Sequence, residues 1–156
     1  MATREEARRF VVQNRRARFE YFIDENLEAG VVLTGSEVKS LRRGQAALVD
    51  AWAGEKQGEL WLFNSYIAEY TEAKNFNHEP KRPRKLLLKA RERDKFLGAI
   101  RRDGATLVPL SIYFNERGIA KVDIGLARGK RKADKRETIK DRDWQRDKAR
   151  LLRAKG

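Results

Sequence analysis

The sequence predicts a mainly β fold: a closed antiparallel barrel of about six strands with two or three short helices, plus a basic C-terminal tail that is disordered when free. Three observations predict it. Hydrophobic residues in 14–127 recur mainly with a period of two, as in half-buried strands. Short segments containing glycine, asparagine or aspartate separate the apolar runs, as in hairpins. Residues 128–156 carry 13 bases, 5 acids and few apolar side chains, so they cannot form a core.

The first predicted elements are a strand and a helix. Residues 21–33 contain the runs YFI and VVL around the acidic segment DENLEAG, and we interpret them as one long or broken strand. The helix begins with capping-type residues at Thr34, carries Val38 and Leu41 three residues apart, and stops at Gly44. The strand therefore leads directly into the helix.

The middle of the chain predicts a hairpin and a second helix. The runs ALVDAWA and ELWLFNSYIAEY flank a glycine-bounded loop at 54–58 and form the hairpin. The second helix covers roughly 92–102, has its apolar residues on one side, and ends at an Asp-Gly pair. The leucines at 86–88 could extend this helix or form a short strand, and periodicity alone does not decide between the two.

The last two predicted strands show the clearest alternation. VPLSIYF at 108–114 and AKVDIGL at 120–126 each place their apolar residues on one face, and NERG at 115–118 is typical of the loop of an antiparallel hairpin. The residues of these two faces are Val108, Leu110, Ile112, Phe114, Ala120, Val122, Ile124 and Leu126. Together the elements predict a closed barrel of OB-like type.

Charge divides the chain unevenly. Of the net charge of +13, residues 1–127 hold +5 and residues 128–156 hold +8. We expect an N-terminal extension at 1–13, an OB-like barrel at 14–127 that binds the polyanion, and a basic tail at 128–156. A pI near 10.3 points to a polyanionic partner, either nucleic acid or an acidic membrane face.

The composition excludes several classes of protein. The chain has no cysteine, so disulfides and thiol chemistry are excluded, and its single histidine argues against a zinc site or a histidine relay. No run approaches the roughly 18 apolar residues needed to span a bilayer. The N-terminus also lacks the apolar stretch of a secretory signal, so we expect a cytoplasmic protein.

Histidine and carboxylate side chains offer no convincing active site. His78 lies beside Glu79, but no nucleophile is nearby, and we interpret it as a turn histidine satisfied by backbone groups. The scattered acids match no metal-ligand loop and are typical of a solvated edge; they are Asp24, Glu25, Glu28 and Glu37. We therefore expect no enzymatic activity, no metal and no cofactor.

Basic residues gather in three clusters next to aromatic or apolar residues: RRARF at 15–19, RR at 42–43 and PKRPRK at 80–85. Arginine binds phosphate through forked donors and also stacks on bases. Nearby aromatic side chains could add stacking, although burial in the barrel is the alternative for Tyr21. These aromatic candidates are Phe19, Tyr21 and Phe76. Three such clusters in a net-basic barrel make RNA the leading partner.

The tail carries weak helix signals. Acids precede bases by three residues at three places, worth about 0.2 to 0.5 kcal/mol per pair, which is too little to hold a free helix. Trp144, Leu151 and Leu152 recur at seven and eight residues, so a formed helix would align them in one stripe. One hypothesis is a tail that becomes helical on an RNA-lined surface. The alternative is a permanently disordered tether that adds only nonspecific affinity.

Five separated blocks, in order from residue 14 over nearly the whole chain, carry a family resemblance: NRRARFEYFI (14–23), EAGVVLTGSEVKSLRRG (28–44), FNHEPKRPRKLLL (76–88), KVDIGLARGK (121–130) and DKRETIKDRDWQRDKAR (134–150). They resemble the signature blocks of the SsrA-binding protein family, also called small protein B. The resemblance implies an RNA-binding protein, not an enzyme, with an OB-like barrel that binds the tRNA-like domain of transfer-messenger RNA.

The resemblance also implies a role in trans-translation. The complex, delivered with elongation factor Tu, enters ribosomes stalled on messages without a stop codon, where the protein takes the place of a missing anticodon arm. The tail then occupies the empty mRNA channel at the decoding centre, against small-subunit rRNA, and the incomplete product is tagged for degradation. We expect the protein to act as a monomer.

Individual residues carry over by position. Glu37 in GSEVKS matches an acidic RNA-contact residue of the family, and Leu87 matches a leucine at the same RNA face. Lys89 stands where some relatives have asparagine, so an amide contact is not carried over there, whereas a phosphate contact is compatible with lysine. The expected RNA-binding residues are Arg15, Arg16, Arg18, Phe19, Glu37, Lys39, Arg42, Arg43, Arg84, Lys85, Leu87 and Lys89.

The tail matches the family at its decoding-centre segment and at its channel-docking positions. Asp134-Lys135-Arg136 matches the segment near the decoding centre, preceded by Ala133 where some relatives carry a histidine. Trp144 and the Leu151-Leu152 pair match positions associated with docking in the channel. The tail residues expected to contact the ribosome are Lys130, Arg131, Lys132, Asp134, Lys135, Arg136, Lys140, Arg142, Trp144, Lys148, Arg150, Leu151 and Leu152.

Three alternatives remain open at this stage. The strongest is an OB-type ribosomal or translation-associated protein that coats RNA with little specificity. A more distant one is an RNA-processing enzyme that uses carboxylates and magnesium. A membrane-surface role for the tail is weaker, because the apolar stripe is too thin for interfacial burial.

Overall fold

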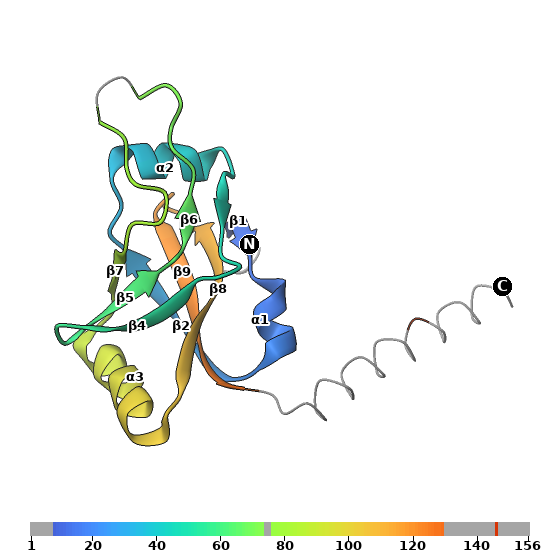
Figure 1. Cartoon of the computed structure of the whole chain (residues 1–156), viewed down its shortest axis with the longest axis vertical. Helices are drawn as coiled ribbons and strands as arrows, with labels where there is room; N and C mark the ends of the chain where they lie inside the picture. The colour runs from blue at the N-terminus through green and yellow to red at the C-terminus, as the bar shows by residue number, and fades with distance from the viewer. Residues whose placement is uncertain (1–7, 74–75, 130–145, 147–156) are drawn as a thin grey trace, which may run out of the picture.

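The computed structural model describes residues 8–73, 76–129 and 146, in which three helices and nine strands form (Figure 1). The helices are α1 (Arg15–Glu20), α2 (Gly35–Arg42) and α3 (Ala90–Asp103). The strands are β1 (Arg9–Gln13), β2 (Tyr21–Val31), β3 (Ala46–Ala47), β4 (Trp52–Lys56), β5 (Glu59–Phe63), β6 (Tyr66–Ile67), β7 (Arg84–Leu87), β8 (Thr106–Phe114) and β9 (Ala120–Gly129). None of the helices in this described part is long and apolar enough to cross a membrane.

Six strands form an antiparallel ring in the order β8, β4, β5, β7, β2 and β9, and β9 pairs again with β8 to close it. The shortest pairing in the ring is between β4 and β8, where Ala53 lies opposite Leu107. The short strands β3 and β6 pair separately. The prediction of a mainly β, closed antiparallel barrel with two or three helices is therefore confirmed.

Residues 9–13 belong to the sheet, which the sequence analysis did not predict. They form β1 and pair with β8 outside the ring, so the segment expected as an N-terminal extension includes an edge strand. The short helix α1 was also not predicted; Asn14 caps it by accepting a hydrogen bond from Ala17 N at 3.3 Å. The division into extension, barrel and tail otherwise stays a prediction, and residues 130–145 and 147–156 of the tail lie outside the described residues.

Two β-bulges give the barrel a second core. The register of β2 shifts between Ile23 and Glu25, and that of β8 shifts between Pro109 and Ser111. Each extra residue reverses the face on which the following apolar side chains lie. The apolar side chains at one end of each strand therefore point out of the ring, and those at the other end point into it. The outward ends pack under α1 in a small cluster made of Ala17, Val108, Leu110 and Ala127, with Tyr21 and Ile23 against it.

The bulge corrects one prediction about β8. The sequence analysis placed four residues of 108–114 on a single face, but Ile112 and Phe114 lie in the main core, whereas Val108 and Leu110 lie under α1. The physical reason is the one-residue shift, which alternation alone does not reveal. In contrast, the apolar face of β9 is continuous, as predicted: Ala120, Val122, Ile124 and Leu126 all contact the main core.

The turn between β4 and β5 is shorter than the predicted loop at 54–58. The predicted hairpin of β4 and β5 exists, but its connection is the two-residue turn Gln57-Gly58, in which both φ angles are positive (54° and 75°). This backbone twist matches that of the flanking strands. Gly54 is not in the loop; it lies within β4 opposite Trp61, where a Cβ would come 2.5 Å from the ring of Trp52.

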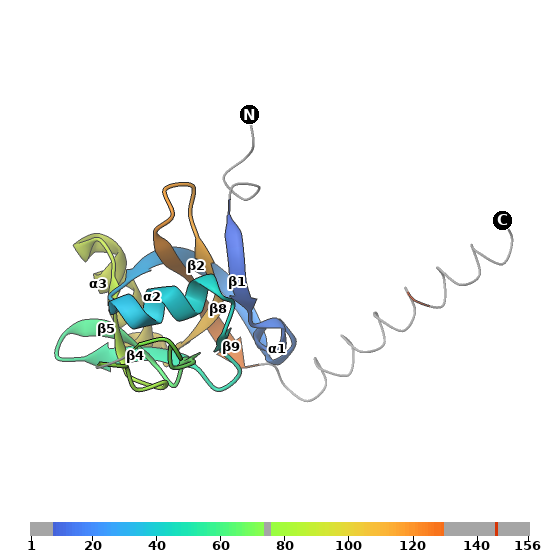
Figure 2. The same cartoon turned by 90° about the horizontal axis from the view of Figure 1, so that it is seen from above.

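The two predicted helices close the barrel at different places. The helix α2 crosses one end of the ring (Figures 1 and 2), and α3 buries Phe96 and Leu97 in the main core. Lys95 pairs with Glu25 at 2.6 Å, which ties α3 to β2. The open alternative at 86–88 resolves in favour of a strand, because Leu86 is buried in β7 opposite Val31 of β2.

The start of α2 offers a test of the local signals. Thr34 Oγ1 accepts a hydrogen bond from Glu37 N, and Glu37 Oε1 accepts one from Thr34 N, which is a complete capping box. Replacing Thr34 with alanine removes one half of it, and we expect a loss of about 0.5–2 kcal/mol in the free energy of unfolding, measured by urea denaturation. Thr71→Ala, at an exposed turn residue, is the control and should leave the midpoint unchanged. Equal midpoints for the two variants would contradict the cap.

Candidate nucleic-acid interface

The strand β7 divides the basic segment 80–85 into inward and outward side chains. Arg84 and Leu86 point into the barrel and are 0% and 2% exposed, whereas Leu87 is 51% exposed. Lys85 is half-buried, and Lys89, the residue before α3, is exposed. The alternation of a strand explains this division, because successive side chains lie on opposite faces. Of the RNA-binding residues expected on this segment, Lys85, Leu87 and Lys89 are therefore accessible.

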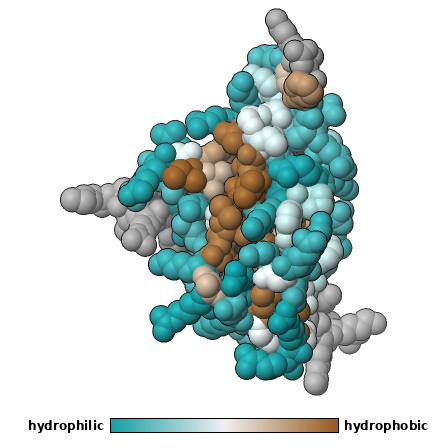
Figure 3. Space-filling view, turned by 90° about the vertical axis from the view of Figure 1, so that its left-hand side faces the viewer, coloured by the Kyte–Doolittle hydropathy of each residue, from teal (hydrophilic) through white to brown (hydrophobic). Residues whose placement is uncertain are grey.

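Figure 3 views the molecule from the side on which β7 lies in Figure 1 and shows a band of hydrophobic side chains bordered by hydrophilic ones. Val32, just beyond β2, and Leu87 on β7 are both exposed hydrophobic residues here, and Val32 N donates a hydrogen bond to Lys85 O. Lys85 and Lys89 form no ion pair within the described residues. The surface thus combines apolar contact area with free positive charge.

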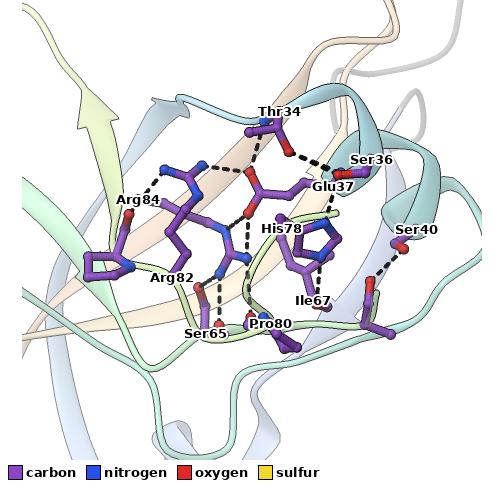
Figure 4. Close-up of polar contacts among 12 residues, drawn as sticks. Thr34, Ser36, Glu37, Ser40, Ser65, Ile67, His78, Pro80, Arg82 and Arg84 are labelled. Atoms are coloured by element: carbon purple, nitrogen blue, oxygen red, sulfur yellow. Dashed lines mark hydrogen bonds and ion pairs between the residues drawn. The ribbon is translucent and has the colours of Figure 1, made fainter. Parts of the chain in front are cut away.

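Glu37 is the centre of a buried ion cluster that joins α2 to β7 (Figure 4). Its carboxylate accepts a hydrogen bond from Arg82 Nη2 at 2.6 Å and one from Arg84 Nε at 2.5 Å. Arg84 also donates to Ser65 O and Oγ at 2.8 and 2.9 Å and to Pro80 O at 3.2 Å. The side chains of Glu37 and Arg84 are both 0% exposed.

This burial changes the role of two residues expected at the RNA interface. The sequence analysis placed Glu37 and Arg84 among the RNA contacts, but neither presents any side-chain surface to a partner. Their carboxylate and guanidinium groups are satisfied inside the protein, where they position α2 and β7, and direct contact of either side chain with RNA stays a prediction. A buried charge is retained only where an opposite charge and hydrogen bonds compensate for its desolvation.

The charge state of Glu37 follows from its surroundings. Burial by itself would raise the pKa of its carboxyl group, but the hydrogen bonds from Arg82 and Thr34 N and the charge of Arg84 outweigh that effect. The net result is a pKa below the ordinary value of 4.5. Glu37 is therefore ionised at neutral pH, which matches its two cationic partners.

His78 is a structural residue beside this cluster. Its Nε2 lies 2.9 Å from Ile67 O, and its Nδ1 lies 2.9 Å from Ser36 Oγ (Figure 4). A carbonyl oxygen only accepts, so Nε2 carries a proton toward Ile67 O. The predicted satisfaction by backbone groups holds for one ring nitrogen, which contacts a carbonyl, whereas the other contacts a side-chain hydroxyl. Within the described residues, no three histidine or carboxylate side chains gather as a metal site.

The helix α2 presents a cationic face to solvent. Its opposite face buries Glu37, Ser40 and Leu41, so Lys39, Arg42 and Arg43 are exposed. The cations of Lys39 and Arg43 lie 5.4 and 4.6 Å from the centre of the Tyr70 ring, and that of Arg42 lies 5.2 Å from the centre of the Phe114 ring. Arg43 also pairs with Glu72 at 2.9 Å. Aromatic contacts thus restrict the motion of these cations while their donors stay accessible.

The third predicted cluster lies on α1, on the far side of the ring from β7 (Figure 1). Arg15 and Arg16 are exposed, and Arg16 pairs with Glu20 at 2.8 Å. Phe19 is half-buried, and the side chain of Arg18 lies outside the described part of the chain. Tyr21 packs against the cluster under α1, which favours core packing over base stacking. The structure thus joins two predicted clusters, through Glu37, and leaves the third apart.

The sequence analysis did not single out Arg9 and Arg117. The pairing of β1 with β8 brings Arg9 opposite Phe114, close to the loop that carries Arg117. The only sequence signal was the apolar run FVV at 10–12, which is typical of a strand and went unassigned. The predicted tail contacts from Lys130 to Leu152 lie outside the described residues, so they stay a prediction.

A closed, basic β-barrel with cations on one covering helix and with apolar and cationic side chains on one strand defines a protein of the nucleic-acid-binding class. The chain belongs to the SmpB, or SsrA-binding, protein family: a family model described as SmpB protein matches residues 11–154. An SsrA-binding protein of Methylobacterium sp. (strain 4-46) is 63% identical over 150 residues, which cover 96% of each chain.

Other relatives agree. An SsrA-binding protein of Novosphingobium aromaticivorans is 59% identical over 149 residues, covering 96% of this chain and 93% of that protein. A solved structure described as "tmRNA-SmpB: a journey to the center of the bacterial ribosome" is 50% identical, with a TM-score of 0.65. The match covers 82% of this chain and 93% of the chain in that solved structure.

The buried cluster can be tested by changing its carboxylate. Glu37→Gln leaves Arg84 buried without its counter-charge, and we expect a loss of about 3–5 kcal/mol in the free energy of unfolding at pH 7. Because the folded-state pKa of Glu37 is lowered from 4.5, this contribution is complete above that value and is lost as the pH falls through the lower folded value. Denaturant titrations between pH 2 and 7 measure both effects.

The matched control is Glu72→Gln, which removes an exposed partner of Arg43. Its effect on the free energy of unfolding at pH 7 should be much smaller, because solvent screens the exposed pair. A Glu37→Gln protein that is as stable as the Glu72→Gln protein would contradict the positioning role.

Proposed function

We propose that this chain binds transfer-messenger RNA through the exposed side of β7 and the cationic face of α2, and that it acts in trans-translation on stalled ribosomes. The observation that carries the proposal is family membership: SsrA-binding proteins about 60% identical match over nearly the entire chain. The geometry supports it, because Lys85, Leu87 and Lys89 lie on one strand and its extension beside exposed Val32. The chain is an RNA-binding protein and not an enzyme.

The barrel would hold the tRNA-like domain of this RNA. Leu87 offers apolar contact, while Lys89 and the α2 cations Lys39 and Arg42 neutralise phosphates. Glu37 and Arg84 hold α2 and β7 at a fixed spacing, so that both sets of side chains meet the same rigid RNA. Specificity then comes from shape as well as from charge, as is general for folded RNA.

The remaining parts of the proposal concern the partners. The chain would act as a monomer in the cytoplasm and join a delivery complex with elongation factor Tu. Its tail, residues 128–156 with a net charge of +8, would enter the mRNA channel near the decoding centre. The helix α1, which carries Arg15, Arg16, Arg18 and Phe19, lies apart from β7 and would face a different RNA surface from the one held by Leu87 (Figure 1).

The β7 surface can be tested at Leu87. Leu87→Ala should weaken binding to the tRNA-like RNA about tenfold or more, because an apolar side chain of this size contributes about 1.5–3 kcal/mol when buried. Lys89→Ala should lower the slope of log K against log salt by about one. Filter binding or fluorescence anisotropy at several salt concentrations measures both quantities.

The control for Leu87 is Val49→Ala, another exposed apolar residue, 58% exposed and away from β7. It should leave the affinity unchanged. If Leu87→Ala binds the tRNA-like RNA as tightly as the Val49→Ala protein does, the proposed surface is wrong. If the parent chain binds an unrelated structured RNA equally well at moderate salt, the less specific OB-type function replaces the proposed one.

The tail is tested by deletion. A chain ending at Gly129 should bind the tRNA-like RNA with unchanged affinity but fail to support tagging in a reconstituted translation reaction. A full-length chain with Trp144, Leu151 and Leu152 changed to alanine should show the same failure with an unchanged melting temperature. Loss of RNA binding on deletion, or tagging at the normal rate, would contradict this division of roles.

A further inference from the structure

A polar hollow of about 380 Å³ lies where β1, β8 and β9 run side by side. Strand register places three polar side chains in one row across it: Gln13 lies opposite Ser111, and Ser111 lies opposite Asp123. Cβ atoms of opposite residues are about 4.5–5.5 Å apart, so the row can meet one small ligand at several points. Phe10 and Leu110 add apolar walls. The volume is within the range of about 300–1,000 Å³ typical of small-ligand sites.

Asp123 is a nearly buried carboxylate with spare capacity to accept hydrogen bonds. Its neighbours Val122 and Ile124 face the main core, so its side chain lies on the outer face of β9, where it lines the hollow. It is 8% exposed, and Oδ1 accepts a hydrogen bond from Asn26 Nδ2 at 2.9 Å. Its other oxygen, Oδ2, has no partner within the described residues. That oxygen is therefore available to an N–H donor of a ligand.

Two more side chains of the hollow are available to a ligand. Ser111 is 5% exposed, and its hydroxyl makes no hydrogen bond within the described part of the chain. Buried polar side chains almost always have a partner, so this hydroxyl is an independent indication of a binding site. The amide of Gln13 is exposed and equally free among the described residues. The row therefore offers an acceptor, a hydroxyl and an amide donor together.

The charges around the hollow decide which ligand chemistry fits. Asp123 requires N–H donors, which a cationic group or a neutral base could supply. The net charge of +13 repels a cationic ligand, and Arg15 at the rim forms no ion pair within the described residues. An anionic ligand with a neutral donor edge meets both conditions. Guanine nucleotides have this chemistry, because the base presents the adjacent donors N1–H and N2–H beside the acceptor O6.

We propose that this hollow binds a guanine nucleotide, with N1–H and N2–H donating to Asp123, O6 accepting from Gln13 and the phosphate against Arg15. A carboxylate accepts two N–H donors, and an amide nitrogen donates to a carbonyl oxygen. Adenine and cytosine present an acceptor nitrogen where guanine presents N1–H, so neither satisfies the carboxylate. The site thus selects one base, which contacts to phosphate alone cannot do. None of these residues belongs to β7 or α2, so the inference does not depend on the proposed function.

The site is tested by titrating the full-length chain with 5′-GMP and with 5′-AMP and recording backbone amide signals in NMR spectra. GMP should shift the signals of Gln13, Ser111 and Asp123 and bind about tenfold or more tightly than AMP, because two hydrogen bonds discriminate between the bases. Arg15→Ala should weaken GMP binding several-fold but leave binding of guanosine, which has no phosphate, unchanged. Equal affinities for GMP and AMP, or no shift at millimolar GMP, would overturn the site.

A substitution at Asp123 separates ligand binding from a structural role. Asp123→Asn keeps an oxygen for Asn26 but turns an N–H donor toward the hollow. Its preference should therefore switch from GMP to xanthosine 5′-monophosphate, which carries an oxygen in place of the amino group, and unfolding cannot produce such a gain. Asp50→Asn, at an exposed aspartate outside the hollow, is the charge-matched control and should keep the preference for GMP. If Asp123→Asn binds every nucleotide as the parent chain does, Asp123 serves only to hold Asn26 and the proposal is wrong.

The guanine can come from a free nucleotide or from an unpaired guanosine of an RNA chain, and competition distinguishes these sources. Displacement of fluorescently labelled GMP by the tRNA-like RNA, or by small ribosomal subunits, supports a guanosine of that RNA. Labelled GMP that stays bound in the presence of saturating RNA supports a free guanine nucleotide. Leu87→Ala should leave GMP binding unchanged even where it weakens binding of the tRNA-like RNA. Failure of this proposal is thereby distinguished from failure of the proposed function.

Discussion

The buried carboxylate of Glu37 is the constraint on which the rest of the interface depends. A charged group with 0% exposure persists only because two guanidinium groups and a backbone N–H surround it. Arg82 lies near the end of the long segment between β6 and β7, Arg84 is the first residue of β7, and Glu37 lies in the first turn of α2. The ion cluster therefore fixes α2, β7 and the connection before β7 relative to one another. The positions of the exposed cations on α2 and β7 follow from this arrangement.

The arginines of this chain divide into two groups by their partners. One group joins elements of the barrel: Arg93 reaches Glu59, Arg101 reaches Glu55, and Arg128 reaches Asp24. The other group, which includes Arg9, Arg42 and Arg117, has no carboxylate partner within the described residues. The formal net charge of +13 indicates a polyanionic partner but does not indicate which cations contact it. The pairing decides which cations remain available to it.

The elements could be predicted where a local signal was strong. The capping residues of α2, the helical spacing before Asp103-Gly104 and the alternation of β9 all have short-range causes, and each was read correctly. The bulges of β2 and β8 could not be predicted, because an extra residue is defined only against the partner strand. For the same reason β1 was missed: five residues become a strand only when β8 lies beside them.

The sequence by itself determined the fold class, the basic character and the family, since hydrophobic period, charge and the order of signature blocks are properties of the chain. Only the tertiary structure decided which charges are inside. Arg84 and Lys85 are neighbours in a basic run, yet the pleat of β7 turns one into the barrel and leaves the other at the surface. Burial and long-range pairing are set by distant segments, and so the division between buried and exposed basic residues exists only in the folded molecule.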